Sequence, residues 1–293
     1  MKKSITKNAI VRYLIICFCI TYLSWGCVAF YSRAQNVNFN TYTWMLILYV
    51  LGVISPAISA IFVERTYEKK KYKEIIKGIF RLPSHKSDWV IGLIAVSVLQ
   101  LLPYFVWGGE IVSSFVNLVI LIPMFLIIGG MEEIGWRGFW LKRELQINEQ
   151  RRFWVVLKVG IVWQLWHLPL FLMLGTYQQL RTDLLLHTLS TLAITFLIGG
   201  LYIRGRSTFL CVILHSLINS LSDIVVVNQN LISSIVIMMA CIGSFFIMDI
   251  GDRKESACVY KIDRMKDEAI NSKLTESLEA TEDLNLTRWN KWK

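Results

Sequence analysis

Residues 118–137 read LVILIPMFLIIGGMEEIGWR, an apolar run that ends in two adjacent glutamates and an arginine. The run resembles a membrane span, yet Glu132, Glu133 and Arg137 stand at its end. An ionisable side chain in hydrocarbon costs about 2.5 to 3.5 kcal/mol on insertion scales, so a chain that keeps one usually keeps it for function. We therefore expect this stretch to form part of a buried polar site in a membrane protein.

The composition agrees with a membrane protein. Hydrophobic residues make up 55% of the 293 residues, and the mean hydropathy is +0.50, which excludes an ordinary soluble domain. A helix needs about 20 apolar residues to cross about 30 Å of hydrocarbon, and such windows lie near 9–31, 42–64, 89–108, 111–131, 153–174, 184–203, 207–227 and 231–250. The runs are continuous and do not alternate, which favours helices over a barrel. The predicted fold class is all-α, a polytopic membrane protein with about eight transmembrane helices around a polar cavity.

Two parts of the chain are predicted to differ in character. Residues 1–250 form the membrane domain, with an uncleaved first helix, and the motifs that carry chemistry lie within 129–223. Residues 251–293 form a charged cytoplasmic tail with equal numbers of acidic and basic residues. The six cysteines include no CxxC pair, so neither a disulfide framework nor a zinc cluster is expected.

Basic residues in the loops predict the orientation, since Lys and Arg gather on the cytoplasmic side. They are concentrated at the N-terminus and in the loops after the second, fourth and sixth windows, whereas the opposite side holds only Arg33 and Arg181. Both termini, and the Glu132 end of the fourth helix, should therefore be cytoplasmic, in what we expect to be a bacterial plasma membrane. Topology explains the positive charge, so no nucleic-acid partner is expected.

One cytoplasmic loop has a helical pattern of its own. Tyr72, Ile75, Ile76, Ile79 and Phe80 recur at helical spacing between lysines. This pattern predicts an amphipathic helix that lies on the inner leaflet of the bilayer.

The two glutamates should differ in role. Glu133 and Arg137 are four residues apart and share a helix face, so an ion pair is expected. Glu132 faces about 100° away and has no cation at that spacing. The sequence thus predicts a structural Glu133 and a Glu132 that is free to act as a general base.

The fifth window contains a histidine near its end. Trp163 and His167 share a helix face, and Pro169 should weaken the helix beside the histidine. Structural and functional roles for His167 are both open from the sequence alone. His187, in the sixth window, has no polar companions and is expected to be structural.

The seventh window carries a polar stripe. His215, Asn219 and Asp223 follow one another at steps of four residues. An imidazole, an amide and a carboxylate are poorly suited to lipid, so this face should point into the bundle.

Together these residues could hydrolyse an amide. A general base, a group that orients water and donors for an oxyanion are the required parts, and Glu132, His167, His215 and Asn219 supply them. Glu132, His167 and His215 are equally plausible ligands for a divalent metal such as zinc, although no HExxH motif occurs. No GxSxG elbow or paired aspartates support another protease chemistry.

The motifs in this order resemble the CPBP family of intramembrane proteases, also called Abi, which includes the type II CAAX prenyl endopeptidases. The resemblance rests on Glu132-Glu133-x-x-x-Arg137, an aromatic residue four positions before His167, and His215-x-x-x-Asn219. It covers about 129–223. The family usually has phenylalanine where this chain has Trp163, which affects the expected pocket shape.

The resemblance implies a catalytic set of Glu132, Glu133, His167, His215 and Asn219, with Arg137, Trp163 and Asp223 in support. Glu132 would activate water together with His167, while His215 and Asn219 would bind the oxyanion or complete a metal site. A metal and a metal-independent glutamate mechanism both stay open. The implied substrate is a membrane-associated peptide, CAAX-type prenylated or a pheromone or bacteriocin, approached from the cytoplasmic side.

Two other functions use the same polar cavity. A non-catalytic immunity protein would sequester a peptide toxin there, but binding alone would not require the full set of polar residues. A transporter would use Glu132 and His215 as a proton relay, and it predicts internal repeats, which the sequence does not show.

Overall fold

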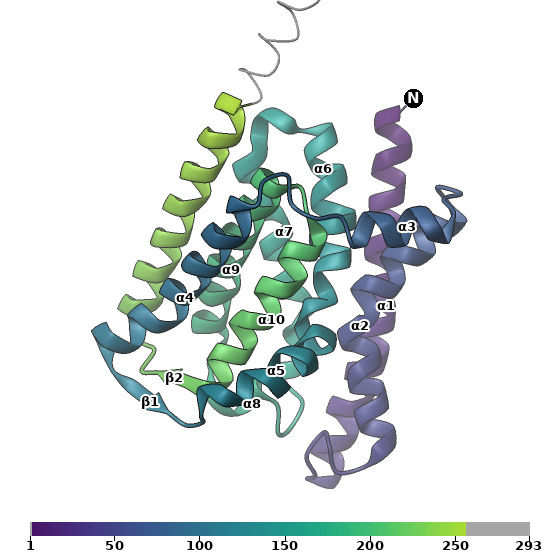
Figure 1. The fold of residues 1–293 in the computed structure, drawn as a ribbon. Coiled ribbons are helices and arrows are strands. Elements are labelled where there is room, and N and C mark those ends of the chain that lie inside the picture. The colour runs from purple at the N-terminus through teal and green to yellow at the C-terminus, as the bar shows by residue number, and fades with distance from the viewer. Residues whose placement is uncertain (1, 256–293) are drawn as a thin grey trace, which may run out of the picture. The chain divides into compact units, whose positions relative to one another are not determined.

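The computed structural model describes residues 2–255, and these residues are almost entirely helical (Figure 1). The elements in chain order are α1 (Lys2–Gln35), α2 (Thr43–Thr66), α3 (Tyr72–Ile79), α4 (Ser87–Trp107), β1 (Gly109–Ile111), η1 (Phe115–Asn117), α5 (Leu118–Phe125), η2 (Leu126–Gly130), η3 (Ile134–Leu141), α6 (Lys142–Ile147), η4 (Glu149–Arg151), α7 (Arg152–Trp166), η5 (Leu168–Phe171), α8 (Tyr177–Arg181), α9 (Leu184–Gly205), α10 (Thr208–Ile224) and β2 (Val225–Val227). A last helix occupies Leu231–Glu255.

The predicted class, an all-α polytopic membrane protein, is confirmed. Within the described residues, six helices are long and apolar enough to cross a membrane, and seven if the bent pair Phe115–Gly130 and Ile134–Ile147 is one span. Helix α10 is apolar but has only 17 residues. The structure thus has a helix at each of the eight predicted windows, although three of these helices, in the fourth, fifth and seventh windows, are shorter or more broken than predicted.

The fourth window is not one continuous helix, contrary to the prediction. Its first residue belongs to β1, and the helix breaks at Ile128 (φ −93°, ψ 75°) and Gly129 (φ 129°, ψ −63°). The second half then continues to Ile147 at an angle of 45° to the first. A φ of 129° is open to glycine and strained for other residues, so the Gly129-Gly130 pair makes the break possible.

The break changes the expected place of the two glutamates. Glu132 and Glu133 lie in the middle of the bent pair, not at the cytoplasmic end of a helix as predicted.

The fifth and seventh windows end early for identifiable reasons. Helix α7 stops at Trp166, and His167 is followed by the 3-10 turn η5 with Pro169 near its start, as the proline predicted. Helix α10 ends at Ile224 because the next three residues pair antiparallel with β1, from Gly109↔Val227 to Ile111↔Val225. This short ribbon is the one departure from an all-helical fold in the described residues.

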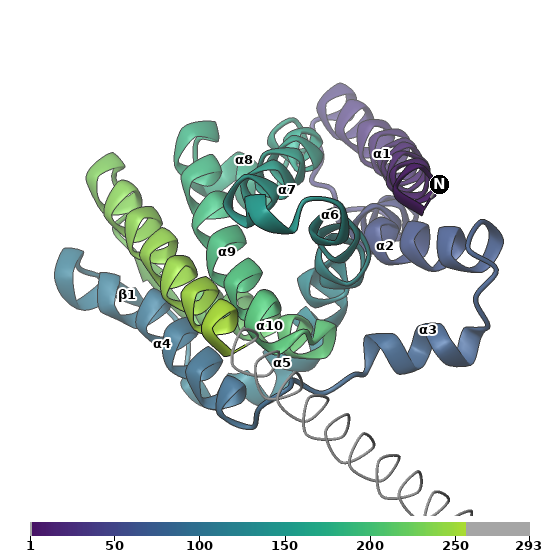
Figure 2. The ribbon, with the colours of Figure 1, turned by 90° about the horizontal axis from the view of Figure 1, so that it is seen from above.

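The helices run between two chemically different ends. The end with the basic loops, called the basic end below, carries α3, α6 and the junction of α9 with α10, and lies at the top of Figure 1. The opposite end carries β1, β2 and α8. Seen along the helices in Figure 2, α1 packs beside α2 and α7 beside α9, while α10 contacts α4, α5 and α9. Helix α10 is therefore placed to bring its polar stripe to the helix break.

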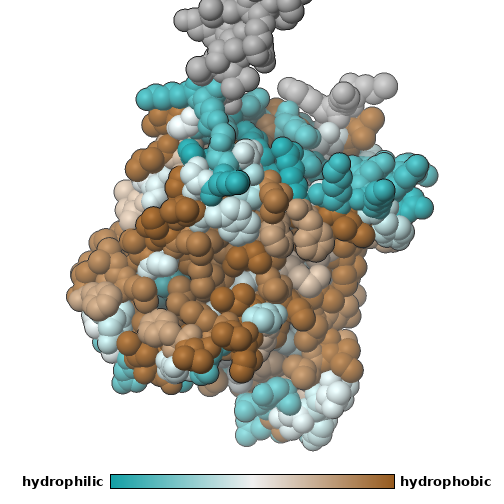
Figure 3. Space-filling model, in the orientation of Figure 1, coloured by the Kyte–Doolittle hydropathy of each residue, from teal (hydrophilic) through white to brown (hydrophobic). Residues whose placement is uncertain are grey.

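The surface follows the same division. In Figure 3 the hydrophilic residues gather over α3 and the basic end, and the sides of the bundle are hydrophobic. The predicted helix at residues 72–80 is confirmed as α3, with Ile75 buried while Tyr72, Ile76 and Phe80 are exposed. Exposed apolar groups on a short helix at this margin suit contact with lipid.

An ion-pair cluster joins two segments at the basic end. Arg143 donates from Nε to Glu68 Oε1 (2.8 Å) and from Nη2 to Glu64 Oε1 (2.8 Å), and Lys70 pairs with both glutamates. Burial acts to raise the pKa of the Glu68 carboxyl, but the Arg143 and Lys70 hydrogen bonds and charges prevail, so its pKa lies below the ordinary value. The cluster ties the end of α2 to α6.

A basic residue of α7 also has an acidic partner. Lys158, which could have extended towards the headgroups, donates to Glu144 Oε1 at 2.8 Å.

The chain divides into two units, Met1–Met248 and Asp249–Lys293. The described part of the second unit is helical, with an ion pair between Arg253 Nε and Asp249 Oδ2 at 3.0 Å. Most of the predicted tail, 251–293, lies outside the described residues, and the proposed boundary at residue 250 stays a prediction.

Candidate active site

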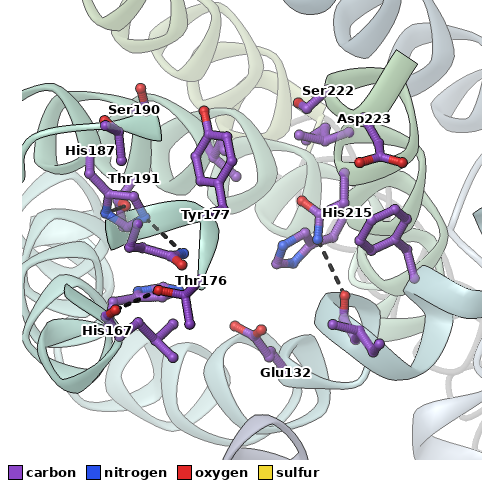
Figure 4. Close-up of a pocket in the computed structure, with 18 of the residues that line it drawn as sticks. Glu132, His167, Thr176, Tyr177, His187, Ser190, Thr191, His215, Ser222 and Asp223 are labelled. Atoms are coloured by element: carbon purple, nitrogen blue, oxygen red, sulfur yellow. Dashed lines mark hydrogen bonds between the residues drawn. The ribbon is translucent and has the colours of Figure 1, made fainter. Parts of the chain in front are cut away.

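Six of the eight site residues predicted from the sequence line one cavity of about 420 Å³ in the first unit, whereas Glu133 and Arg137 lie outside its lining. Its lining includes Glu132, Trp163, His167, His215, Asn219 and Asp223. Figure 4 shows Glu132 between His167 on one side and His215 on the other, with its carboxylate directed into the pocket. Three segments far apart in sequence thus supply the polar groups.

Glu132 is held by a hydrogen bond and not by a cation. It is only 6% exposed, and its Oε2 accepts a hydrogen bond from the indole Nε1 of Trp163 at 2.9 Å. Among the described residues no Lys, Arg or His forms an ion pair with it. The Trp163 donor was not predicted from the sequence.

Glu133 is fully buried, and one of its carboxylate oxygens contacts two partners. Its Oε1 accepts from Arg137 Nη1 at 2.8 Å, the predicted pair at four-residue spacing, and lies 2.7 Å from His215 Nδ1. The contact with His215 joins η3 to α10 across 82 positions of sequence. Glu133 therefore orients a histidine of the pocket as well as neutralising Arg137.

His167 and His215 both present the ring nitrogen Nε2 to the pocket, because Nδ1 of each ring contacts the protein. His167 Nδ1 lies 2.9 Å from the Trp163 carbonyl oxygen, and His215 Nδ1 contacts the Glu133 carboxylate. Carbonyl and carboxylate oxygens only accept hydrogen bonds, so both Nδ1 atoms carry hydrogen. The Nε2 atom of each ring is left for another partner, such as water or a substrate.

Asn219 reaches the helix break. Its Nδ2 donates to the carbonyl oxygen of Ile128, a residue with non-helical backbone angles, at 3.4 Å. A Cβ built on Gly129 would overlap Asn219 Nδ2 and come within 3.5 Å of His215 Nε2. The absence of a side chain at Gly129 therefore makes room for both polar groups of α10.

Two comparisons with known proteins cover this site. Residues 113–221 match the family model described as type II CAAX prenyl endopeptidase Rce1-like. The chain is also 28% identical over 238 residues to a CAAX prenyl protease 2 of Methanococcus maripaludis, a match that covers 74% of this chain and 85% of that protein. Residues 113–221 therefore resemble a CAAX-protease domain, and this matched region is called the CAAX-protease domain below. The resemblance predicted from the sequence is thereby confirmed, and the chain is an integral membrane protein.

The CAAX-protease domain contains all the candidate residues except Asp223, which lies two positions beyond the matched region. Asp223 is exposed and lines the same pocket as His215 and Asn219, so the predicted stripe does face the interior cavity. It stands at the outer part of the pocket and makes none of the contacts that hold Glu132 or Glu133.

His187 belongs to the pocket of the CAAX-protease domain, although the sequence suggested a purely structural role. Its ring centre lies 5.1 Å from that of His167, and its Nδ1 is 2.8 Å from Gln164 Oε1. Figure 4 shows it beside Thr191 on the same wall as His167. His187 stands one turn into α9, and only the packing of α9 against α7 brings it there.

Whether this CAAX-protease domain could hold a metal ion depends on how its His, Cys, Asp and Glu side chains are arranged. No group of three or more His, Cys, Asp or Glu side chains within residues 2–255 is arranged to hold a metal ion. Glu132, His167 and His215 share the pocket without forming such a group, so we derive no catalytic step through a metal. The metal requirement stays a prediction, to be tested by experiment.

Proposed function

We propose that the chain is an intramembrane endopeptidase that hydrolyses a peptide bond of a membrane-associated peptide with a water molecule activated by Glu132. The proposal includes a bacterial plasma membrane with both termini in the cytoplasm. The observation that carries it is the buried Glu132 carboxylate, which has no ionic partner in the described residues and faces a pocket that also holds two imidazoles and an amide. The relative named CAAX prenyl protease 2 supports a peptide as the substrate class.

The chemistry follows from the donors and acceptors of the pocket. Glu132 removes a proton from water as the water oxygen attacks the carbonyl carbon, and His167 Nε2 accepts the second hydrogen of that water to orient it. The amide of Asn219, and His215 when its Nε2 is protonated, donate to the oxyanion that forms. Glu132 then gives its proton to the amide nitrogen, the C–N bond breaks, and the amine leaves.

Glu133 has a different part in this proposal. It fixes the His215 ring through Nδ1 and offsets the charge of Arg137, so it acts through another residue and does not touch the substrate. The two adjacent glutamates thus separate positioning from proton transfer.

The pocket walls suit an amphiphilic peptide. One part of the wall is apolar and comes from α1, α2 and η5, with Trp25, Tyr49, Val53 and Leu170. Another part is polar and comes from the start of α9 and the end of α10. A peptide with an apolar anchor next to the scissile bond could bury the anchor and leave its amide groups on the polar side.

The experiment is cleavage of a panel of membrane-anchored peptides by the purified full chain in nanodiscs. Glu132→Gln should abolish cleavage, whereas Glu110→Gln, an exposed glutamate on β1, should leave it unchanged. Both variants should elute as the parent protein does in gel filtration. Cleavage by Glu132→Gln at the parental rate would overturn the mechanism.

Two further arms separate the remaining possibilities. Loss of cleavage with a strong chelator, and recovery on adding zinc, would add a metal to the mechanism. If no peptide is cleaved but Glu132→Gln binds a peptide toxin and protects cells as well as the parent protein does, the non-catalytic immunity function replaces the protease.

A further inference from the structure

The cavity that holds Glu132 is built from one end of the bundle. Its lining residues on α9 run from His187 to Ile194, in the first half of a helix that reaches the basic end at Arg204. On α10 the lining starts at His215 and continues to Asp223, at the far end from the basic junction with α9. The lining of α4 and α7 likewise lies in the half of each helix away from the basic end.

Large side chains fill the space between Glu132 and the basic end. Trp136, Arg137 and Trp140 are fully buried, and Phe139 is 1% exposed. Trp136 and Trp140 lie 6.0 Å apart between ring centres, and Tyr13 stacks on Phe139 at 4.8 Å. These residues follow Glu132 along η3 towards α6, so a packed aromatic layer separates the carboxylate from the basic end.

The outer part of the cavity is polar and accessible. Tyr177 on α8 is 57% exposed, and Asp223 and Gln229 are also exposed. All three line the cavity, and we call them the pocket mouth. Figure 4 shows Asp223 on the same side of the pocket as His215, and Tyr177 between His187 and His215. Helix α8 and strand β2 lie at the lower end of Figure 1.

Charge assigns a side of the membrane to each end. The loops at the basic end carry most of the Lys and Arg residues of the membrane unit, whereas the other end has Arg33 and Arg181 beside Glu110, Asp183 and Asp223. Basic loops stay in the cytoplasm. The pocket mouth therefore belongs on the extracytoplasmic side.

We propose that the pocket admits its substrate from the extracytoplasmic side, so that the substrates are membrane-anchored peptides whose scissile segment is exposed on that side. That the pocket has a peptide substrate rests on the proposed function. The direction from which the substrate enters rests on the packing beside Glu132 and on the charge of the two ends. It reverses the cytoplasmic approach expected from the sequence, because the aromatic layer around Trp136 occupies that route.

The direction can be measured without any cleavage. Single cysteines replace Tyr177 at the mouth, Ser190 on the pocket wall, or Glu74 on α3, in a chain whose six native cysteines are changed to serine or alanine. Intact cells are treated with a small membrane-impermeant thiol reagent, before and after permeabilisation. We expect Tyr177→Cys and Ser190→Cys to react in intact cells, and Glu74→Cys only after permeabilisation.

Each other pattern overturns the proposal in an identifiable way. Labelling of Tyr177→Cys only after permeabilisation would place the mouth in the cytoplasm. Labelling of Tyr177→Cys but not Ser190→Cys in intact cells would show that the pocket is closed from outside. If Ser190→Cys does not fold, Ser222→Cys, another lining residue, takes its place. Because labelling is independent of Glu132, a failed protease assay and a wrong direction give different results.

Discussion

Trp163 joins the separate parts of the site through one side chain. Its N–H donates to Glu132, and its ring face lies 4.7 Å from the Arg137 guanidinium carbon. Its ring also contacts those of His167 (5.3 Å) and His215 (5.5 Å). The tryptophan is therefore more than an aromatic wall, because its indole nitrogen orients the carboxylate that is proposed to activate water.

Trp163→Phe should separate these two contributions. Phenylalanine keeps a ring against Arg137 but cannot donate to Glu132, so we expect kcat/KM to fall about tenfold, equivalent to about 1.4 kcal/mol of transition-state stabilisation. Trp163→Ala removes the ring as well and should cost more. Steady-state cleavage of one peptide by the three proteins measures both steps, and equal losses in the two variants would contradict a role for the indole N–H.

Glu133→Gln should destabilise the fold, whereas Glu132→Gln should not. Removing the Glu133 charge leaves Arg137 buried without its anion, a change worth about 3 to 5 kcal/mol for a broken buried pair. The glutamine oxygen can still accept a hydrogen bond from His215, so the loss is that of the charge. Glutamine at position 132 can still accept the Trp163 N–H. Thermal unfolding in detergent would compare the two variants, and a similar unfolding temperature for both would argue against the Glu133 network.

Only part of this network could be predicted from the sequence. The Glu133–Arg137 pair follows from helical spacing alone, and the structure confirms it. The contacts of Trp163 with Glu132 and of Glu133 with His215 join residues 31 and 82 positions apart. No local rule pairs such residues, because their meeting depends on how α7 and α10 pack against η3.

At the scale of elements, the break in the fourth span determines how the site is assembled. The non-helical backbone at Ile128 and Gly129 lies where Asn219 donates to the Ile128 carbonyl oxygen, and Gly129 has no Cβ to exclude the Asn219 amide. Hydropathy windows detect apolar composition and not φ, so they predicted the helix and missed its break. The glycine pair was visible in the sequence but was not interpreted as a break.

Gly129→Ala should test the break. A Cβ at this position would overlap the Asn219 amide on a backbone with φ of 129°, so the variant should lose most activity and about 1 to 3 kcal/mol of stability. Gly243→Ala is the matched control, because a Cβ there meets nothing within 4 Å. Activity and unfolding temperature are measured for both, and an active, stable Gly129→Ala would show that the break is not required.

At the scale of the whole molecule, the sequence predicted the membrane class, the helical windows and the charge asymmetry between the two ends. It predicted approach of the substrate from the cytoplasmic side, the opposite of the direction proposed from the packing. That direction depends on which side chains fill the space between Glu132 and the basic end. Trp136 and Trp140 are apolar whether they fill this space or line an open cavity, so their residue type does not reveal the direction. Composition therefore distinguishes the two ends of the bundle, but packing alone distinguishes the open end from the closed one.

The cluster at the basic end predicts how the stability of the whole membrane unit depends on pH. Because Arg143 and Lys70 hold the folded pKa of Glu68 below its ordinary value, the unfolded chain binds more protons than the folded one as pH falls. The stabilisation is fully present above the ordinary carboxyl pKa of about 4.3 and is lost as pH falls through the lower folded value. Unfolding temperatures should thus be level from pH 6 to 8 and drop below about pH 4.3. Glu68→Gln should lower stability at neutral pH and flatten part of the acid drop, and an unchanged acid profile would show that Glu68 does not hold α2 to α6.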